Sequence, residues 1–587
     1  MHGVHVGRVR FSAPRMEFMA RKINYDNWSK EELIKELRRI KETKYGLVWH
    51  RDFPEEKIDI LINPDARTPN EMFPNEMAGK PFPILKETKS KEVNGDKGKP
   101  INLLIEGDNY HSLAVLNFTH QEAIDVIYID PPYNRGINGG NDFRYNDKFV
   151  DSEDPFRHSK WLSFMERRLK LAKNLLKLSG VIFISIDNTE QAPLRLLCDE
   201  IFGEKNFVGN LIWRKKEGGG QADSYFVTEH EYILVYAKSE EFNWIDEEVP
   251  VIEAQFNKKD ENGKFTAVKL AKWGNTARRE DRPKMHFSIK APDGKNIYPI
   301  APDGGDGRWR VGKKRMDMLI EKKLIFWQEK NGKWIPYEKI YFDGEDVKKI
   351  KERSILYDLA TTADGTNELT EIFGKKDIFE NPKPTELIKF FLRYGADENA
   401  VVLDFFAGSS TTGQAVMGLN DEDKGTRQFI LCTNNENNIC TDVCYPRLKK
   451  VIKGYKNPKG ENVAGLGGNL KYYKTDFVEA EPTDRNKRKL VSESTEMLCI
   501  RENAFELVQY GSDFKIFKND KIHLGIVFYE EAIGDFKKAI KKIKGHFNAY
   551  IFSMTDDPHK DKFKDVKNVT LCAIPEVILK VYREIFK

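Results

Sequence analysis

An acidic residue, two prolines and an aromatic residue follow one another at Asp130, Pro131, Pro132 and Tyr133. They come directly after the apolar run 123–129, which is typical of a buried strand. A carboxylate beside a rigid turn and a flat ring can accept hydrogen bonds from an exocyclic amino group and stack on the heterocycle that carries it. The four residues therefore predict a catalytic site for the amino group of a nucleobase.

A second chemical signal lies far along the chain. An apolar strand leads into Asp404, Phe406 and Gly408 in a tight loop of small residues, and a helix follows. Such a loop lets a ligand approach backbone N–H groups at a helix N-terminus. It has neither the pattern G-x-G-x-x-G nor the lysine of a phosphate-binding loop. An acid here suits a cationic group, such as the sulfonium or ammonium of S-adenosylmethionine. Glu436, after the next predicted strand, stands where a nucleotide-binding α/β unit holds a ribose diol.

The two loops can form one cleft, because ligands of open α/β sheets bind outside the carboxyl ends of the strands. Asp130 and Asp404 both occupy such ends. This geometry predicts methyl transfer from S-adenosylmethionine to an amino nitrogen. The Asp130 carboxylate and the Pro131 carbonyl would accept the two amino hydrogens, and Tyr133 would stack on the base. A base inside a duplex cannot reach such a cleft, so we expect it to be flipped out.

The order of predicted elements indicates an α/β fold with a Rossmann-like methyltransferase sheet. Continuous apolar strands alternate with amphipathic helices, such as the one expected over 161–178, and this favours a parallel sheet covered on both faces. The strands predicted for this sheet are 101–105, 123–129, 181–186, 401–403 and 429–432. The elements predicted for a small C-terminal α/β domain are strands at 523–529 and 548–552 and helices near 530–544 and 574–586.

A chain of 587 residues is too long for a single core, so several domains are expected. Near the start, Ser29 and Glu32 form a capping box for a helix over 29–44. Further on, residues 258–290 contain ten Lys or Arg against four Asp or Glu, and five of the eight residues 308–315 are basic. Inside a nucleobase-modifying enzyme these stretches favour contact with DNA phosphates. The predicted regions are an N-terminal arm and helix (1–100), the catalytic half of the methyltransferase core (101–213), a target recognition domain (214–365), the cofactor half of the core (366–474) and the C-terminal α/β domain (475–587).

With these motifs in this order, the chain resembles the β-class of amino-methylating DNA methyltransferases. In that class D-P-P-Y precedes the cofactor motif F-x-G-x-G, and the target recognition region lies between them. Within the class the chain is similar to the modification subunit of type III restriction–modification systems, over residues 45–455. The stretches that carry this resemblance are LIEGDNYHSLAVL and IDVIYIDPPYN within 104–134, FISIDN and IFGEKNFVGNLIW within 183–213, HEYILVYAK at 230–238, and FENPKPTELI and VLDFFAGSSTT within 379–412.

The resemblance implies specific roles for ten residues. The catalytic residues it implies are Asp130, Pro131, Pro132 and Tyr133. The residues it implies for S-adenosylmethionine are Asp404, Phe406, Gly408 and Glu436, with Lys383 and Asp108 lining the same site. In one departure from the family, its last loop glycine is Ser410 here, and a serine restricts φ more than a glycine does.

The resemblance also implies a substrate and partners. An Asp at the head of the tetrad leans toward N6 of adenine in this family, so we expect methylation of a specific adenine in double-stranded DNA. N4 of cytosine is the nearest alternative, and RNA or a protein glutamine amide is a more distant one. A catalytically silent DNA-recognition subunit for a partner nuclease is the alternative from another class. The family implies a homodimer, and a restriction system would need a separate ATP-dependent helicase–nuclease subunit, because no phosphate-loop NTPase motif occurs in this chain.

Composition favours a cytoplasmic protein. Hydrophobic residues make up 40% of the chain and charged residues 32%. No run approaches the roughly 18 to 20 apolar residues of a membrane span, and residues 1–18 lack the apolar core of a secretory signal. The formal net charge is only +4, so a DNA-binding surface must be a local patch. The six cysteines lack metal-ligand spacing, and no metal site is predicted.

Overall fold

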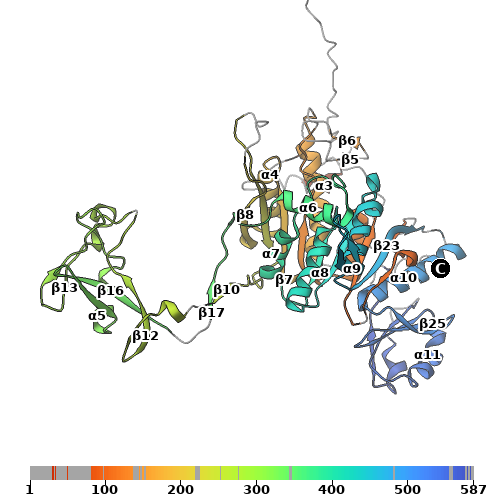
Figure 1. Ribbon diagram of the computed structural model, residues 1–587. Coiled ribbons are helices and arrows are strands. Elements are labelled where there is room, and N and C mark those ends of the chain that lie inside the picture. The colour runs from red at the N-terminus through yellow and green to blue at the C-terminus, as the bar shows by residue number, and fades with distance from the viewer. Residues whose placement is uncertain are drawn as a thin grey trace, which may run out of the picture. The chain divides into compact units, whose positions relative to one another are not determined.

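The computed structural model describes residues 81–574 with short gaps, and a few residues outside this range. It divides into two compact units, one made of Met1–Trp244 and Ser354–Lys587 and the other of Ile245–Arg353 (Figure 1). The arm up to residue 80 and most of the helix predicted at 29–44 lie outside the described residues. The gaps are 97, 137–143, 146–147, 151–153, 219–224, 251–252, 275, 343–346, 480, 482 and 554–558, and the additional described residues are 29–31, 33–34, 49, 578–579 and 582.

Within its described residues, the larger unit contains an eleven-stranded mixed sheet. In spatial order its strands are β1 (Phe82–Glu87), β23 (Asn469–Val478), β3 (Ile101–Glu106), β20 (Gln428–Thr433), β19 (Val401–Asp404), β4 (Ile124–Ile129), β7 (Leu176–Ile186), β9 (His230–Ala237), β8 (Phe207–Arg214) and β18 (Ile355–Leu356), and β2 (Val93–Asn94) also pairs with β23.

The centre of this sheet confirms the predicted α/β fold. Neighbouring strands from β23 to β7 all run parallel. β19 lies between β20 and β4, although it follows β4 only after a long stretch of sequence. The sheet is not wholly parallel as predicted, because β9 runs antiparallel to both β7 and β8, and β1 runs antiparallel to β23.

Helices cover both faces of the sheet (Figure 1). They are α2 (Asn109–Thr119), α3 (Arg157–Leu175), α4 (Gln191–Phe202), α6 (Thr362–Phe373), α7 (Thr385–Gly395), α8 (Thr411–Asp423) and α9 (Tyr445–Lys453). Side chains of α2, α3 and α4 share a buried cluster with Ile127 and Ile129 of β4. Side chains of α6 to α9 share another with Val126 and Tyr128. Successive strand residues point to opposite faces, so the two groups of helices form separate layers.

The helix α3 ends earlier than its periodicity predicts. The helical pattern extends to residue 178, but Leu176 has extended dihedral angles and pairs with Ile124 at the start of β7. Gly180, predicted as the stop after the helix, lies inside this strand, where an added Cβ would be 3.0 Å from the Ile124 carbonyl oxygen. Leu176 is fully buried in the sheet, so tertiary pairing overrides the local helical preference.

The smaller unit, Ile245–Arg353, has its own sheet and core. Its strands β10 (Glu247–Pro250) and β17 (Val347–Ile350) pair antiparallel, so the chain enters and leaves this unit along adjacent strands. Trp309 and Met316 lie in its buried core. The unit is narrower than the predicted segment 214–365, because β9 and β18 pair in the main sheet. Its other elements are β11 (Lys258–Asp260), β12 (Gly263–Lys269), β13 (Ile289–Lys290), β14 (Asn296–Ile297), α5 (Lys313–Glu321), β15 (Ile325–Lys330) and β16 (Lys333–Tyr341).

A second sheet forms near the C-terminal end of the larger unit. Its elements are α10 (Asp484–Glu502), β24 (Glu506–Tyr510), β25 (Phe514–Lys518), β26 (His523–Val527), α11 (Ile533–Ile540), β27 (Phe547–Ile551) and β28 (Val569–Cys572). The elements predicted at 523–529, 530–544 and 548–552 correspond to β26, α11 and β27, whereas most of 574–586 lies outside the described residues. Met497 of α10 shares a buried cluster with Leu524 of β26.

The remaining strands are two short hairpins: β5 (Arg144–Tyr145) with β6 (Lys148–Phe149), and β21 (Gly454–Lys456) with β22 (Asn462–Ala464). Among the described helices, none has both the length and the apolar character needed to cross a bilayer.

Candidate active site

Four acidic residues lie at one edge of the parallel sheet. Asp108, Glu436, Asp404 and Asp130 stand at or just beyond the carboxyl ends of β3, β20, β19 and β4, which are consecutive neighbours. Parallel strands end at the same edge, where ligands of open α/β sheets bind. The sequence predicted one cleft for Asp130 and Asp404, and the pairing of β19 with β4 brings them to adjacent strand ends.

The Asp130 carboxylate is engaged by Lys383 and Tyr133. Lys383 Nζ donates to both of its oxygens at 2.8 Å, and the Tyr133 hydroxyl donates to Oδ1 at 2.7 Å. Burial opposes the charge on Lys383, but Asp130 and Glu231 raise the pKa of its ammonium above the ordinary value. Lys383, expected to line the cofactor site, thus presents its charged end to the predicted catalytic residues. Its N–H groups donate to the same carboxylate oxygens that would accept the hydrogens of a substrate amino group.

Glu231 of β9 completes this cluster, and sequence reasoning gave it no role. Its carboxylate lies 3.0 Å from the Tyr133 hydroxyl and pairs with Lys215 at 3.0 Å and Lys383 at 3.4 Å. Burial opposes ionisation, but Lys383, Lys215 and Arg135 lower the pKa of Glu231 to about 2. The sequence does contain one signal for Glu231. It is an acidic residue within the apolar stretch HEYILVYAK, which is typical of a buried strand.

The Tyr133 ring is covered by cations. Its side chain is buried, with the Arg135 guanidinium 4.8 Å and the Lys383 ammonium 5.2 Å from the ring centroid. Burial, together with Asp130 and Glu231, raises the pKa of the Tyr133 hydroxyl, which therefore remains a hydrogen-bond donor. The ring is buried in this structure, so stacking of a base on it requires neighbouring side chains to move.

Contacts from α3 and α4 fix the turn of the tetrad. Trp161 Nε1 donates to the Pro132 carbonyl at 2.7 Å, and Pro131 is buried. Asn134, the next residue after the tetrad, has φ +59° and donates from its side chain to Glu190 at 2.5 Å. Burial raises the pKa of Glu190, the residue directly before α4, to about 8. The turn is thus tied to a carboxyl group that is mostly protonated at neutral pH.

The loop 405–410 between β19 and α8, called the cofactor loop below, has glycine-like backbone angles at two positions. Gly408 has φ +48°, and an added Cβ would lie 3.3 Å from the Phe379 ring. Ser410 has φ +64°, although it is not a glycine. Its hydroxyl donates to the Cys444 carbonyl at 3.0 Å, which helps to hold this angle. The serine that departs from the family pattern therefore adopts the left-handed conformation that a glycine would supply.

Asp404 organises the start of this loop. Its Oδ1 accepts from the Phe406 backbone N–H at 3.0 Å, and its Oδ2 accepts from the Thr412 hydroxyl at 2.5 Å. Burial raises the pKa of Asp404 to about 7, and Asp130 adds to this effect, while the two hydrogen bonds oppose it. A buried carboxyl close to ionisation suits a cationic ligand. The residues present therefore fit S-adenosylmethionine, whose sulfonium and ammonium are both positive.

Asp108 and Glu436 flank the same edge of the sheet. Asp108 caps α2 by accepting from the Tyr110 N–H at 2.7 Å, and it pairs with Arg168 at 3.3 Å. Glu436 is half-buried and begins the short 3-10 helix Glu436–Asn438 after β20. Among the described residues, no group of three or more His, Cys, Asp or Glu side chains is arranged to hold a metal ion.

The chain is similar to known DNA methylases. The model of a DNA methylase family matches residues 124–442. The chain is 36% identical to the type III restriction–modification enzyme EcoPI Mod subunit of Escherichia phage P1, over 69% of this chain and 71% of that protein. It is also 36% identical to the StyLTI Mod subunit of Salmonella typhimurium, over 57% of this chain and 52% of that protein.

One similar solved structure is that of a DNA modification methylase from Thermus thermophilus, complexed with S-adenosyl-L-methionine. It is 16% identical, with a TM-score of 0.28 over 60% of this chain and 93% of that chain. The family match spans more than half of the present sequence, from β4 through the cofactor loop and β20. The chain belongs to the DNA methylase family and is an S-adenosylmethionine-dependent DNA methyltransferase.

Proposed function

We propose that this chain methylates N6 of a specific adenine in duplex DNA, with Asp130, Pro131, Pro132 and Tyr133 as its catalytic residues. The observation that carries the proposal is the parallel pairing of β4 with β19, which ends both strands at one edge of the sheet. A cation bound at Asp404 and an amino group bound at Asp130 can then occupy one site.

Asp130 acts on the nucleophile. Its carboxylate and the Pro131 carbonyl accept the two amino hydrogens, which draws the nitrogen lone pair out of the ring π system. Bound at Asp404, S-adenosylmethionine supplies a methyl group activated by the positive sulfonium. Holding the nitrogen in line with that methyl group supplies much of the rate. The methylated nitrogen then loses one proton, for which the Asp130 carboxylate is a nearby acceptor.

Lys383 must give way when the base arrives. Its ammonium now takes both oxygens of Asp130, but it also donates to the Tyr133 hydroxyl at 2.9 Å and lies 3.4 Å from Glu231. A small shift toward Glu231 would free one oxygen of Asp130 without leaving a buried charge unpaired. Glu231 thus provides a second anionic partner for Lys383 during turnover.

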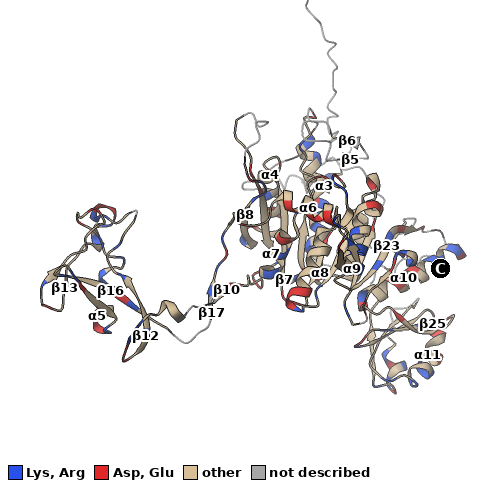
Figure 2. Cartoon of the chain, in the orientation of Figure 1, with Lys and Arg blue, Asp and Glu red and all other residues tan. Residues whose placement is uncertain are grey.

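The unit Ile245–Arg353 supplies the proposed DNA-binding surface. Lys and Arg residues are spread over its elements, as Figure 2 shows. Arg310 and Arg315 of the basic stretch 308–315 both pair with Glu338. Three lysines that line a surface hollow together with an aromatic ring are further candidates for phosphate contact. The residues of this hollow that carry the argument are Phe256, Lys258, Lys259 and Lys264.

We further propose that the chain is the modification subunit of a type III restriction–modification system. The two relatives named above are type III Mod subunits, and the matched region spans 71% of the EcoPI protein and 52% of the StyLTI protein. In this proposal the subunit works as a homodimer beside a separate ATP-dependent restriction subunit. Light scattering of the purified chain, alone and with the candidate restriction subunit, measures both assemblies.

A methyl-incorporation assay tests the chemistry. The chain, labelled S-adenosylmethionine and duplex DNA should yield N6-methyladenine on nucleoside analysis, whereas N4-methylcytosine would overturn the proposed base. Asp130→Ala should lower transfer by at least about 100-fold, since it removes the acceptor for the amino group, and should leave DNA binding intact. Glu122→Ala, which removes an exposed carboxylate just before β4, is the matched control and should keep activity. Single-molecule sequencing of the methylated DNA gives the recognition sequence and strand.

A further inference from the structure

Arg447 is a charged residue buried behind the cofactor loop. It belongs to α9, and its side chain has no exposed surface. Burial lowers the pKa of its guanidinium to about 10, so it still carries a charge at neutral pH. Removing such a group from water is costly, and an apolar side chain of similar volume is often at least as stabilising. A contribution to the stability of the fold therefore does not by itself explain why a guanidinium stands at this position.

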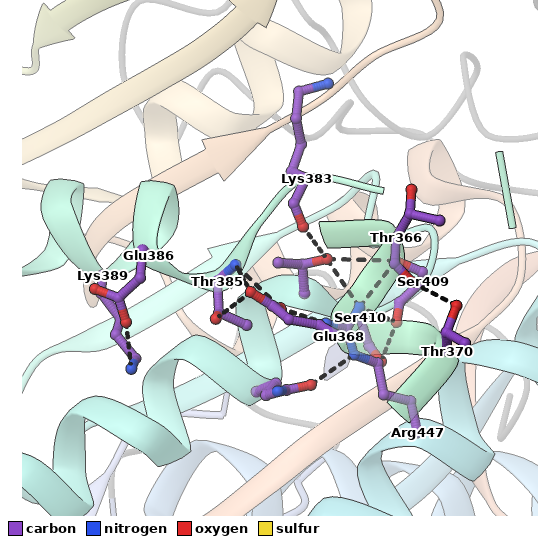
Figure 3. Close-up of polar contacts among 12 residues, drawn as sticks. Thr366, Glu368, Thr370, Lys383, Thr385, Glu386, Lys389, Ser409, Ser410 and Arg447 are labelled. Atoms are coloured by element: carbon purple, nitrogen blue, oxygen red, sulfur yellow. Dashed lines mark hydrogen bonds and ion pairs between the residues drawn. The ribbon is translucent and has the colours of Figure 1, made fainter. Parts of the chain in front are cut away.

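The guanidinium holds the end of the cofactor loop and the first turn of α8. Its Nη1 donates to the Ser409 carbonyl and hydroxyl, both at 3.1 Å, and to the Thr411 hydroxyl at 2.9 Å. Its Nε donates to Gln414 at 2.8 Å. Figure 3 shows these contacts converging on Arg447. The planar, forked geometry of a guanidinium lets one side chain fix several acceptors at once.

A second set of contacts reaches the backbone that carries Lys383. The Thr411 hydroxyl, held by Arg447, donates to the Lys383 carbonyl at 3.1 Å. Arg447 Nη2 lies 3.5 Å from Glu368, which accepts from the Thr385 N–H at 3.2 Å and from its hydroxyl at 2.9 Å. In Figure 3 the Lys383 side chain points away from Arg447, while its carbonyl faces the cluster. The other end of Lys383 is the ammonium that binds Asp130.

We propose that Arg447 is a positioning residue that fixes the cofactor loop and the Lys383 backbone in one geometry. It thereby couples the binding of S-adenosylmethionine to the contact between Lys383 and Asp130. The inference rests on the proposed role of the cofactor loop and adds a residue that touches neither cofactor nor base. Thr411 is the shared link, because its hydroxyl accepts from Arg447 and donates to Lys383.

The test measures S-adenosylmethionine binding by calorimetry and, separately, kcat at saturating cofactor. Arg447→Met should raise the Kd by about tenfold or more and should also lower kcat, since Lys383 loses its fixed backbone. Arg427→Met is the matched control. Arg427 is also buried and also contacts α8, but at the C-terminal end through Asp423. It should lower the melting temperature and leave the Kd unchanged.

Two milder variants keep the test decisive if Arg447→Met does not fold. Thr411→Val preserves shape but breaks the shared link, and Arg447→Lys preserves charge but loses the fork. Each should raise the Kd by a smaller factor, and Thr411→Val should add little in the Arg447→Lys background. A wild-type Kd and kcat in both folded variants would overturn the inference, as would equal effects from Arg427→Met. Absence of binding by the unaltered chain would instead overturn the proposed function itself.

Discussion

The role proposed for the buried carboxyl group of Asp404 predicts that cofactor binding depends on pH. Its pKa is raised to about 7, mainly by burial, and a bound cation favours the ionised form. At pH 6 most of the group is protonated and must lose its proton when the cofactor binds, whereas at pH 8 most of it is already ionised. The affinity for S-adenosylmethionine should therefore be about tenfold lower at pH 6 than at pH 8. Calorimetry at the two pH values measures the difference.

Asp404→Asn is the control for this prediction. The amide cannot ionise, so the variant should bind more weakly and with little dependence on pH. The same pH dependence in the variant would show that another group, such as the cofactor's own ammonium, causes it.

Site residues that a short sequence pattern marks could be predicted from the sequence. Contacts between residues far apart in the chain could not. An acid after an apolar run marks a strand end, and this local signal identifies Asp130 and Asp404. The contact of Lys383 with Asp130 joins positions 253 apart in the chain, and that of Tyr133 with Glu231 joins positions 98 apart. Both contacts depend on how the strands pair, and no short motif records that. The roles of the predicted residues stay predictions until the variants are measured.

The turn that contains the proposed catalytic tetrad depends on the ends of two helices. Asn134 and His158 both contact Glu190 at the N-terminus of α4, and burial raises the pKa of Glu190 to about 8. An acid with a raised pKa holds its proton in the folded state but releases it on unfolding above about pH 4.5. The contribution of Glu190 to the free energy of unfolding is therefore highest at low pH and decreases as pH rises from about 4.5 to about 8.

Glu190→Gln should remove this slope, because the amide imitates the protonated acid. As pH rises, the free energy of unfolding of the variant should increase relative to wild type. The difference should grow by at most about 1.4 kcal/mol per pH unit, the value for one proton. Urea unfolding at pH 5.5 and pH 8 measures the change. Glu204→Gln, at an exposed glutamate just after α4, is the control and should leave the slope as in wild type. Parallel curves for Glu190→Gln and wild type would contradict the prediction.

Element boundaries follow the sequence where one periodicity dominates. The strands predicted at 101–105 and 429–432 are confirmed to within about a residue, because buried parallel strands are continuously apolar. The helix predicted over 161–178 was wrong at its end, since Leu176 satisfies either periodicity and the sheet decides between them. The sequence placed β9 in the separate target recognition domain, whereas it pairs antiparallel in the main sheet. A short apolar run is equally typical of a strand in either position.

At the scale of the whole chain, the insertion is a unit with its own core that interrupts a continuous sheet. The strand before it, β9, pairs with β7 and β8, and the strand after it, β18, pairs with β8 at the edge of that sheet. The strands of the main sheet therefore pair without any strand from Ile245–Arg353. The insertion begins and ends on the antiparallel pair β10 and β17, so the two cut ends can be joined by a short linker.

Replacing Ile245–Arg353 by a short Gly/Ser linker should therefore leave the larger unit folded and separate cofactor binding from DNA modification. The Kd for S-adenosylmethionine should remain within about threefold of wild type, because the four strand-end acids and Arg447 lie outside the deleted segment. Methyl transfer to duplex DNA should fall below detection, since the lysines proposed to contact phosphate are lost. Calorimetry, circular dichroism and the labelled-methyl assay measure the three properties. Normal methylation at the same sites by the shortened chain would assign DNA recognition to the larger unit and overturn the role proposed for the insertion.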